Sequence, residues 1–187
     1  MIRILVLTLL GLLSACMTLP GSDSPTVSRY LISGPDRSCE SGGEPLSLSV
    51  VNVNAGLDND RIARRDANSG EITYLKDVRW ADQLGPLLEQ QMAKDLECAG
   101  FAVLSGHHHR LGQKQMICEA RAFNLVQNGR DAAEVYLSCL FYRGKDDQVS
   151  LVIKQTADLD RWNADAAVAA LSAAYASAMD ELISGIR

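Results

Sequence analysis

Cysteine is the residue type with the widest chemistry in this chain of 187 residues, which contains five of them. Five thiols cannot all pair within one molecule, so at least one must stay free, bind another molecule or carry a modification. Cys39, Cys98, Cys118 and Cys139 are spread through the body of the chain, whereas Cys16 follows an apolar N-terminal run. Cys16 is therefore the first candidate for separate chemistry.

The residues before Cys16 have the three parts of a secretory signal. Arg3 gives a positive start, residues 4–13 are mostly apolar, and small residues precede the cysteine. The apolar run is about half of the ~20 residues that a spanning helix needs. Leu-Ser-Ala-Cys, which ends at Cys16, resembles the bacterial lipobox, in which the cysteine receives diacylglycerol and becomes the first mature residue. The alternative is a plain secretory signal with an incidental cysteine, or a buried first helix.

The lipobox resemblance predicts how the chain is divided and where it lies. Residues 1–15 would be a lipoprotein signal peptide, residues 16–28 a lipidated tether rich in Ser, Gly and Pro, and residues 29–187 the folded domain. Several acyl chains on Cys16, each contributing ~0.8 kcal/mol per buried methylene, would hold the protein at a membrane. Met17 replaces the Asp that marks inner-membrane retention in many Gram-negative bacteria. By that analogy we expect the periplasmic leaflet of the outer membrane.

The four remaining cysteines are an even number in an oxidising compartment, so two disulfides are expected. Residues 115–126 and 132–142 read as strands around an Asn-Gly pair at 128–129, a strong hairpin signal. A two-residue loop there makes Gln127 face Arg130, and the same register makes Cys118 face Cys139, close enough for a disulfide. A longer loop would shift the register. The alternative is two reduced cysteines that act as small apolar core residues.

The same register predicts which face of the hairpin is buried. The expected core face holds both cysteines, and the expected exposed face includes Phe123. Cys39 with Cys98 follows by elimination, joining a polar loop to a helix end.

Other chemistry is not expected. The three consecutive histidines 107–109 have no Cys or carboxylate nearby at ligand spacing, so neither a metal nor another cofactor is predicted apart from the lipid on Cys16. No phosphate loop or nucleophile elbow occurs, and no catalytic residue or enzymatic activity is predicted. A dense charge cluster is either a salt-bridged surface turn or a contact for a partner; it comprises Asp58, Asp60, Arg61, Arg64 and Arg65.

Composition and hydrophobic periodicity indicate which class of protein and which fold to expect. The net charge is −5 and aromatic residues are 5% of the chain, so neither a basic footprint nor a stacking platform for nucleic acid is present. Hydrophobic periodicity predicts one α+β domain, a mainly antiparallel sheet with two long amphipathic helices packed on one face. We expect strands near 29–33, 46–54, 61–65, 71–75, 101–104, 115–126, 132–142 and 149–156, and helices at 82–98 and 164–186. Asp82 and Asn163 are the expected caps of the two helices, Gly100 is expected to end the first, and Trp80 is expected in the core.

Several short segments in this order resemble a known family. They are Leu-Asp-Asn-Asp-Arg-Ile-Ala-Arg-Arg at 57–65, Glu-Ile-Thr-Tyr at 71–74 and Arg-Trp-Ala-Asp at 79–82. A Tyr-Leu-Ile strand precedes them, and a Gly-Phe helix end and an Ala-rich helix follow. This pattern, over about residues 29–186, is similar to the auxiliary lipoproteins of ABC-type transport systems, the PqiC-like membrane-integrity lipoproteins.

The resemblance implies a non-enzymatic accessory subunit. Such lipoproteins accompany an ABC transporter and an MCE-domain protein that bridges the periplasm, in systems that move lipids or other hydrophobic compounds between membranes. The lipoprotein would dock the bridge at the outer membrane, and a homo-oligomer around that bridge is also implied. The alternative is a stand-alone structural or assembly lipoprotein of the cell envelope.

Overall fold

The structure is a computed structural model that describes residues 27–39, 42–105, 114–127, 131–144 and 147–187. The signal peptide, Cys16 and the histidines 107–109 lie outside these residues. Each expected strand and helix has a counterpart, and the largest extension is β4, which runs on to Trp80. The elements are β1 (Ser28–Tyr30), β2 (Glu44–Val53), β3 (Arg61–Asp66), β4 (Ile72–Trp80), α2 (Leu84–Cys98), β5 (Phe101–Ser105), β6 (Lys114–Gln127), β7 (Ala132–Tyr142), β8 (Gln148–Asp158) and α3 (Ala164–Ile186).

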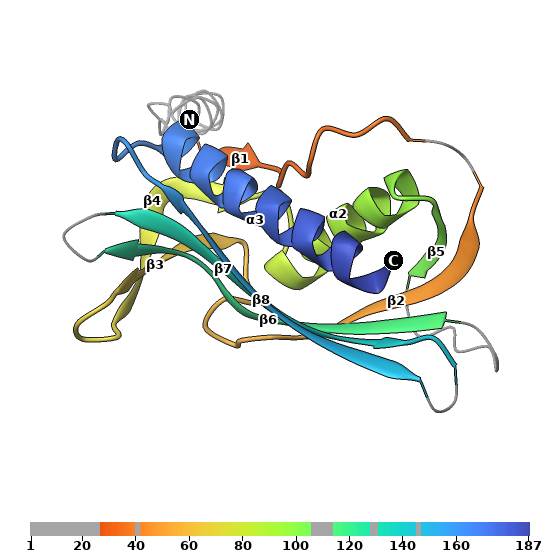
Figure 1. Cartoon of the computed structure of the whole chain (residues 1–187). Helices are drawn as coiled ribbons and strands as arrows, with labels where there is room; N and C mark the ends of the chain where they lie inside the picture. Colours follow the sequence, from red (N-terminus) through yellow and green to blue (C-terminus); the bar gives the residue numbers. More distant parts are fainter. Residues whose placement is uncertain (1–26, 40–41, 106–113, 128–130, 145–146) are drawn as a thin grey trace, which may run out of the picture.

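The eight strands form one forked sheet around β6, the longest strand (Figure 1). On one side β6 pairs along most of its length with β7, which pairs with β8. On the other side the N-terminal half of β6 pairs with β2, and its last residues pair with β3. β2 also pairs with β5, whereas β3 pairs with β4, which in turn pairs with β1. We call the β1–β4–β3 branch the wing.

The sheet is mixed, so the expectation of a mainly antiparallel sheet is wrong. Strands that follow each other in hairpins pair antiparallel, as in β3–β4, β6–β7 and β7–β8. Every described pair between strands that are not consecutive is parallel: β1–β4, β2–β5, β2–β6 and β3–β6. Turn signals reveal only the local hairpins, whereas parallel pairing needs long connections whose endpoints leave no mark in the sequence.

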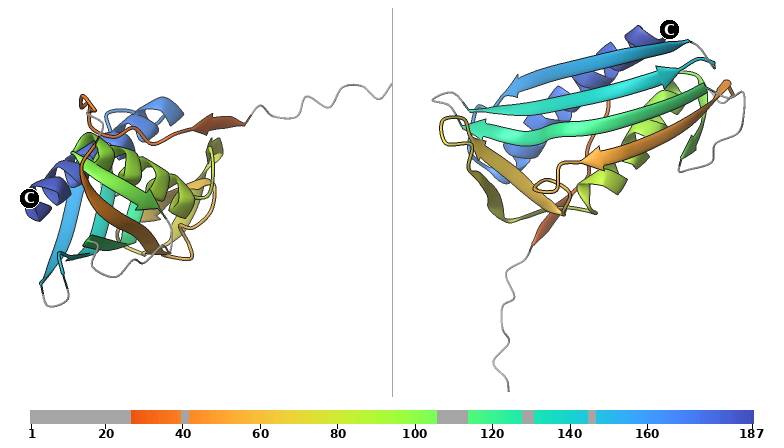
Figure 2. Two further views of the ribbon diagram at one scale, coloured as in Figure 1. Left: turned by 90° about the vertical axis from the view of Figure 1, so that its right-hand side faces the viewer. Right: turned by 90° about the horizontal axis from the view of Figure 1, so that it is seen from below.

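Both helices cover the same face of the sheet. In the right-hand view of Figure 2, seen from below, the helices lie behind the strands. α2 packs on β2 and β5, and α3 crosses β6, β7 and β8. The exposed side of α3 mixes polar residues such as Asp180 with alanines such as Ala173, so the expected amphipathic character of this helix is not shown. α3 is apolar and long enough to cross a membrane, but 61% of that stretch is buried in the fold, as in a core helix.

Two of the three helix ends for which the sequence carries a signal follow that signal. Asn163 caps α3, as predicted, by accepting a hydrogen bond from the backbone N–H of Ala166 at 2.8 Å. Gly100 ends α2 with φ +92°, a conformation that favours glycine. At the start of α2 the expected cap Asp82 is too early, since the cap position is Gln83 and its side chain makes no capping bond.

The β6–β7 hairpin contains a bulge that the sequence did not reveal. Near its loop, opposed residues are one position off the predicted register, as in Val126 opposite Ala132. The register shifts between Ala120 and Ala122, and beyond that point it is the predicted one, with Cys118 opposite Cys139. The predicted partners Gln127 and Arg130 cannot be compared, because residues 128–130 lie outside the described part.

The bulge moves Phe123 into the core, so its prediction as an exposed residue is wrong. One added residue reverses the faces of all later positions in a strand. Phe123 is 1% exposed, and its ring lies 5.7 Å from Trp80 and 6.4 Å from Tyr175. Trp80 is buried, as expected. These three rings join the wing, the central strand and α3.

Candidate functional site

The structure brings the four described cysteines together in the two pairs expected from the sequence. Cys118 and Cys139 lie opposite each other on β6 and β7, both buried on the core side, with sulfur atoms 2.07 Å apart. Cys39, in the loop after β1, has its sulfur 1.87 Å from that of Cys98 at the end of α2. One pair therefore lies inside the sheet, and the other fastens a loop to a helix.

That loop, residues 31–39, crosses the outer side of the helix layer, and we call it the strap (Figure 1). The backbone N–H of Ser33 donates to Oγ of Ser172 on α3 at 3.2 Å, and Arg37 forms an ion pair with Asp180. At Gly34 the strap approaches α2 so closely that an added Cβ would displace the buried Asp95 carboxylate. The strap is thus tied to both helices.

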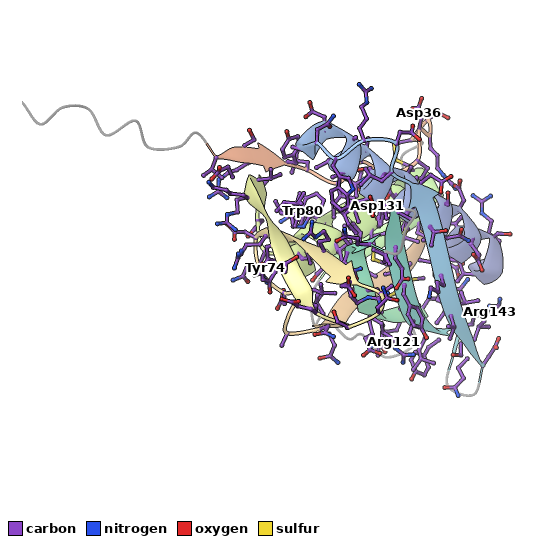
Figure 3. All side chains as sticks on the ribbon, turned by 90° about the vertical axis from the view of Figure 1, so that its left-hand side faces the viewer. Asp36, Tyr74, Trp80, Arg121, Asp131 and Arg143 are labelled. Atoms are coloured by element: carbon purple, nitrogen blue, oxygen red, sulfur yellow. A yellow bond between two sulfur atoms is a disulfide. The ribbon has the colours of Figure 1, made fainter. Side chains whose placement is uncertain are left out.

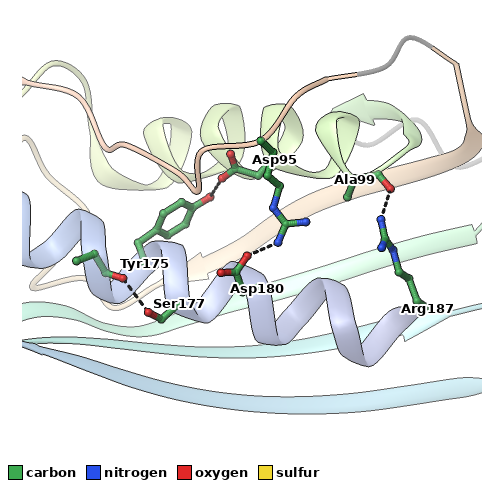
Figure 4. Close-up of polar contacts among 8 residues, drawn as sticks. Asp95, Ala99, Tyr175, Ser177, Asp180 and Arg187 are labelled. Atoms are coloured by element: carbon green, nitrogen blue, oxygen red, sulfur yellow. Dashed lines mark hydrogen bonds and ion pairs between the residues drawn. The ribbon is translucent and has the colours of Figure 1, made fainter.

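A buried polar pair lies beneath the strap (Figure 4). The Tyr175 hydroxyl of α3 donates to Asp95 of α2 at 2.8 Å, and Gln91 donates to the same carboxylate at 2.9 Å. Burial raises the pKa of Asp95, and the two hydrogen bonds only partly oppose that effect. Burial also raises the pKa of Tyr175 well above its usual value, and the nearby carboxylate adds to the rise. The pair links α2 to α3 and is suited to a structural role.

The charge cluster, predicted to be either a salt-bridged surface turn or a partner contact, does not converge on one point. Asp60 lies 3.8 Å from Arg29 of β1, and Arg65 lies 3.4 Å from Glu134 of β7. The Arg61 guanidinium lies 3.8 Å from the centre of the Tyr74 ring. Separately, Arg64 approaches Trp162 and donates to Thr73 at 3.3 Å. Each cation is directed to a different neighbour within the domain.

The fifth member, Asp58, has a role that sequence reasoning missed. Its Oδ1 accepts a hydrogen bond from the backbone N–H of Gly85 at 3.3 Å, and the carbonyl of Asn59 accepts from Leu84 at 3.2 Å. These N–H groups belong to the first turn of α2, which has no capping bond from its own cap residue. The loop before β3 therefore caps a helix that begins some 25 residues later, a pairing with no local sequence signal.

Two of the solvent-accessible cavities lie beside the two ends of α2. One of about 340 Å³ is mostly polar and is lined by Arg29, Asn59, Asp60, Ala81, Asp82 and Gln83, beside the wing and the start of α2. The other, of about 380 Å³, is lined by Pro45, Glu97, Ala102, Val103 and Leu104 along β5. Neither gathers a nucleophile with a base, and no group of three or more metal-ligating side chains occurs among the described residues.

Comparison with known proteins identifies the class of protein. The model of the ABC-type transport auxiliary lipoprotein component family matches residues 31–184. This chain therefore belongs to that family of transport auxiliary components, which is not an enzyme class, and the resemblance seen in the sequence is confirmed. No match was found among curated proteins.

Two solved structures share the fold. A crystal structure of an uncharacterised protein matches with a TM-score of 0.71 and 15% identity, covering 87% of this chain and 99% of that chain. Protein XCC0632 from Xanthomonas campestris, of family DUF330, matches with a TM-score of 0.63 and 17% identity, covering 83% and 92%. At these identities the comparison supports the architecture alone.

Proposed function

We propose that this protein is a lipid-anchored, non-enzymatic accessory subunit of an ABC transport system that contains an MCE-domain protein. Membership of the auxiliary lipoprotein family over residues 31–184 carries this proposal. In it, Cys16 holds the protein at the periplasmic leaflet of the outer membrane, and the folded domain docks the periplasmic bridge there. The transported compound would be a lipid or another hydrophobic molecule.

The position of β1 supports the proposed division into residues 1–15, 16–28 and 29–187. The first described strand begins at Ser28, at the boundary proposed between the tether and the folded domain. A tether of this length extends at most about 45 Å, at roughly 3.3–3.6 Å per residue. The domain would then remain near the membrane surface, with its sheet and helices free to meet a partner or a second copy.

The membrane anchor can be tested separately from the transport role. Cys16→Ala should release the protein from the membrane fraction, because the acyl chains would have no attachment point. A Cys39→Ala/Cys98→Ala variant is the matched control, since it also removes thiols but should stay membrane-bound. If the Cys16→Ala protein remains tightly bound in membranes washed with high salt, the lipid anchor is wrong.

The transport role is tested by cross-linking the lipidated, full-length protein in cells and identifying what copurifies. We expect an MCE-domain protein and transporter subunits in the wild-type sample. Repeated recovery of the intact, membrane-bound lipoprotein without either would overturn the accessory role and favour a stand-alone structural lipoprotein.

A further inference from the structure

Three arginines lie side by side across the wing. Arg79 of β4 is the direct neighbour of Arg29 on β1 and of Arg61 on β3. Neighbouring residues in a register project from the same face of a sheet. Tyr30 and Trp80, the next residues along, form the adjacent register pair. Trp80 is buried in the core and Tyr30 reaches α3, so the arginines are on the outer face, away from the helices.

Like charges placed directly opposite each other across strands are destabilising. One carboxylate compensates in part, since Asp60 lies 3.8 Å from Arg29, and the Tyr74 ring accepts Arg61. Within the described residues, neither Arg79 nor Arg61 forms an ion pair. The row therefore keeps positive charge that the domain itself does not neutralise, although the chain as a whole is acidic.

The central member of the row also lacks a hydrogen-bond partner. Nη1 of Arg79 is buried and makes no hydrogen bond to the described part of the chain. A buried donor left unsatisfied is costly, and more so on a charged group. Guanidinium groups bind phosphate through paired N–H donors, a geometry that a row of three arginines offers repeatedly. The uncompensated charge calls for an anion, and because Nη1 of Arg79 is buried, the exposed Arg29 and Arg61 are the members of the row that an anion meets first.

Exposed apolar side chains flank this row on β1. Val27 is 41% exposed and Leu31 is 65% exposed, and each is two residues from Arg29. In an extended chain, residues two apart point the same way. Apolar and cationic side chains on one surface are typical of proteins that lie on a bilayer, where the cations meet headgroup phosphates and the apolar groups enter the interface. A free phosphate ion would give these apolar groups no role.

We propose that Arg29, Arg61 and Arg79 bind the phosphate of an anionic phospholipid headgroup and so lay the wing on the membrane. This inference rests on the proposed lipid anchor, which would hold β1 within one tether length of the bilayer. It assigns Arg61 to lipid in place of the partner contact expected from the sequence. The polar cavity beside the row is not the phosphate site, because Asp60 and Asp82 line it.

The test uses the full-length, lipidated protein reconstituted in nanodiscs of phosphatidylcholine alone or with phosphatidylglycerol. Hydrogen–deuterium exchange of peptides from β1 and β4 reports contact with the headgroups. We expect slower exchange in these peptides when phosphatidylglycerol is present, and loss of the difference in the Arg29→Gln/Arg61→Gln/Arg79→Gln variant. Arg143→Gln is the matched control: this exposed arginine ends β7, away from Tyr74 and Trp80 of the wing (Figure 3), and should leave the difference intact.

Each outcome has a separate meaning. Stable insertion in phosphatidylcholine nanodiscs tests the anchor, so failure there would overturn the proposed function and not the arginine row. An equal response of wild type and triple variant, with both folded by circular dichroism, would overturn the row. Because Arg79 is partly buried, the Arg29→Gln/Arg61→Gln variant, which keeps it, gives a second test and should weaken the response. Protection by inorganic phosphate alone, without lipid dependence, would overturn the headgroup as the ligand.

Discussion

The strap follows the first strand of the wing directly in sequence, but the two regions are held in different ways. The strap is joined to α2 by a disulfide and to α3 by a hydrogen bond and an ion pair. The wing is attached through β3, which pairs with only the last residues of β6, and its β1 strand is three residues long. Its β3–β4 ladder is interrupted, and Asp77 within β4 has φ +56°.

This difference indicates a division of roles. The helix side satisfies its polar groups internally, as in the contact between Asp95 and Tyr175, which makes it a rigid support. The wing leaves Nη1 of Arg79 unsatisfied and exposes Val27 and Leu31. In the membrane contact proposed above, the wing is the region that meets the bilayer. The following changes test the comparison.

Phe123→Ala should have the largest effect, because this ring contacts both Trp80 of the wing and Tyr175 of α3. Truncation of a buried Phe costs about 3–5 kcal/mol of unfolding free energy. Urea unfolding followed by circular dichroism measures the loss. Leu140→Ala, at a more exposed position of β7, is the control and should cost far less. Equal losses would show that Phe123 does not join the two regions.

Removal of the strap disulfide should come next. Cys39→Ala/Cys98→Ala opens a closed loop with a sequence separation of 59 residues, and Cys118→Ala/Cys139→Ala opens one of 21. Disulfides typically contribute about 2–4 kcal/mol, and more for longer loops. We therefore expect the strap pair to cost more stability than the hairpin pair in urea unfolding without reductant. The reverse order would mean that the strap is not a main fastening of the helix layer.

Tyr175→Phe should lower the unfolding free energy by about 1–3 kcal/mol in urea unfolding, because it leaves the buried Asp95 carboxylate with one hydrogen-bond partner fewer.

The role of Asp95 is tested by the pH dependence of the unfolding free energy. Because burial raises its pKa in the folded state, the folded protein binds more protons than the unfolded chain between the two pKa values. Stability from this group is therefore highest below about pH 4 and falls as pH rises through the folded pKa.

Asp95→Asn should lack that pH dependence. As pH rises from about 4 to 7, the unfolding free energy of the variant should therefore increase relative to that of the wild type. Parallel urea titrations at several pH values give the difference directly. A wild-type and variant difference that is constant with pH would contradict the assignment of the titration to Asp95.

The smallest effect is expected at the start of α2. Asp58→Ala removes the side chain that accepts from Gly85 and should cost about 1 kcal/mol, the usual value for a helix cap. Asp82→Ala is the comparison, since Asp82 accepts only from the neighbouring Gln83 N–H. If Asp82→Ala costs more in urea unfolding, the cap expected from the sequence would be the true one.

Much of this fold could be predicted because its signals are local. Asn163 as a cap, Gly100 as a helix end and the hairpin strands depend on residues within a few positions of each other. The opposition of Cys118 and Cys139 was predicted from an assumed two-residue loop. Near the loop the strands are one position off that register, and the bulge restores it before the cysteines are reached. Phe123, between loop and bulge, was therefore assigned to the wrong face.

The sequence by itself determined the set of elements, the paired cysteines, the acidic charge and the family to which the chain belongs. Only the tertiary structure decided the parallel pairings, the capping of α2 by Asp58, the fastening of the strap and the row of Arg29, Arg79 and Arg61. The physical reason is that hairpins and caps act between neighbours along the chain. Parallel ladders and cross-strand rows bring together residues far apart in sequence, and their register is fixed only when the whole core packs.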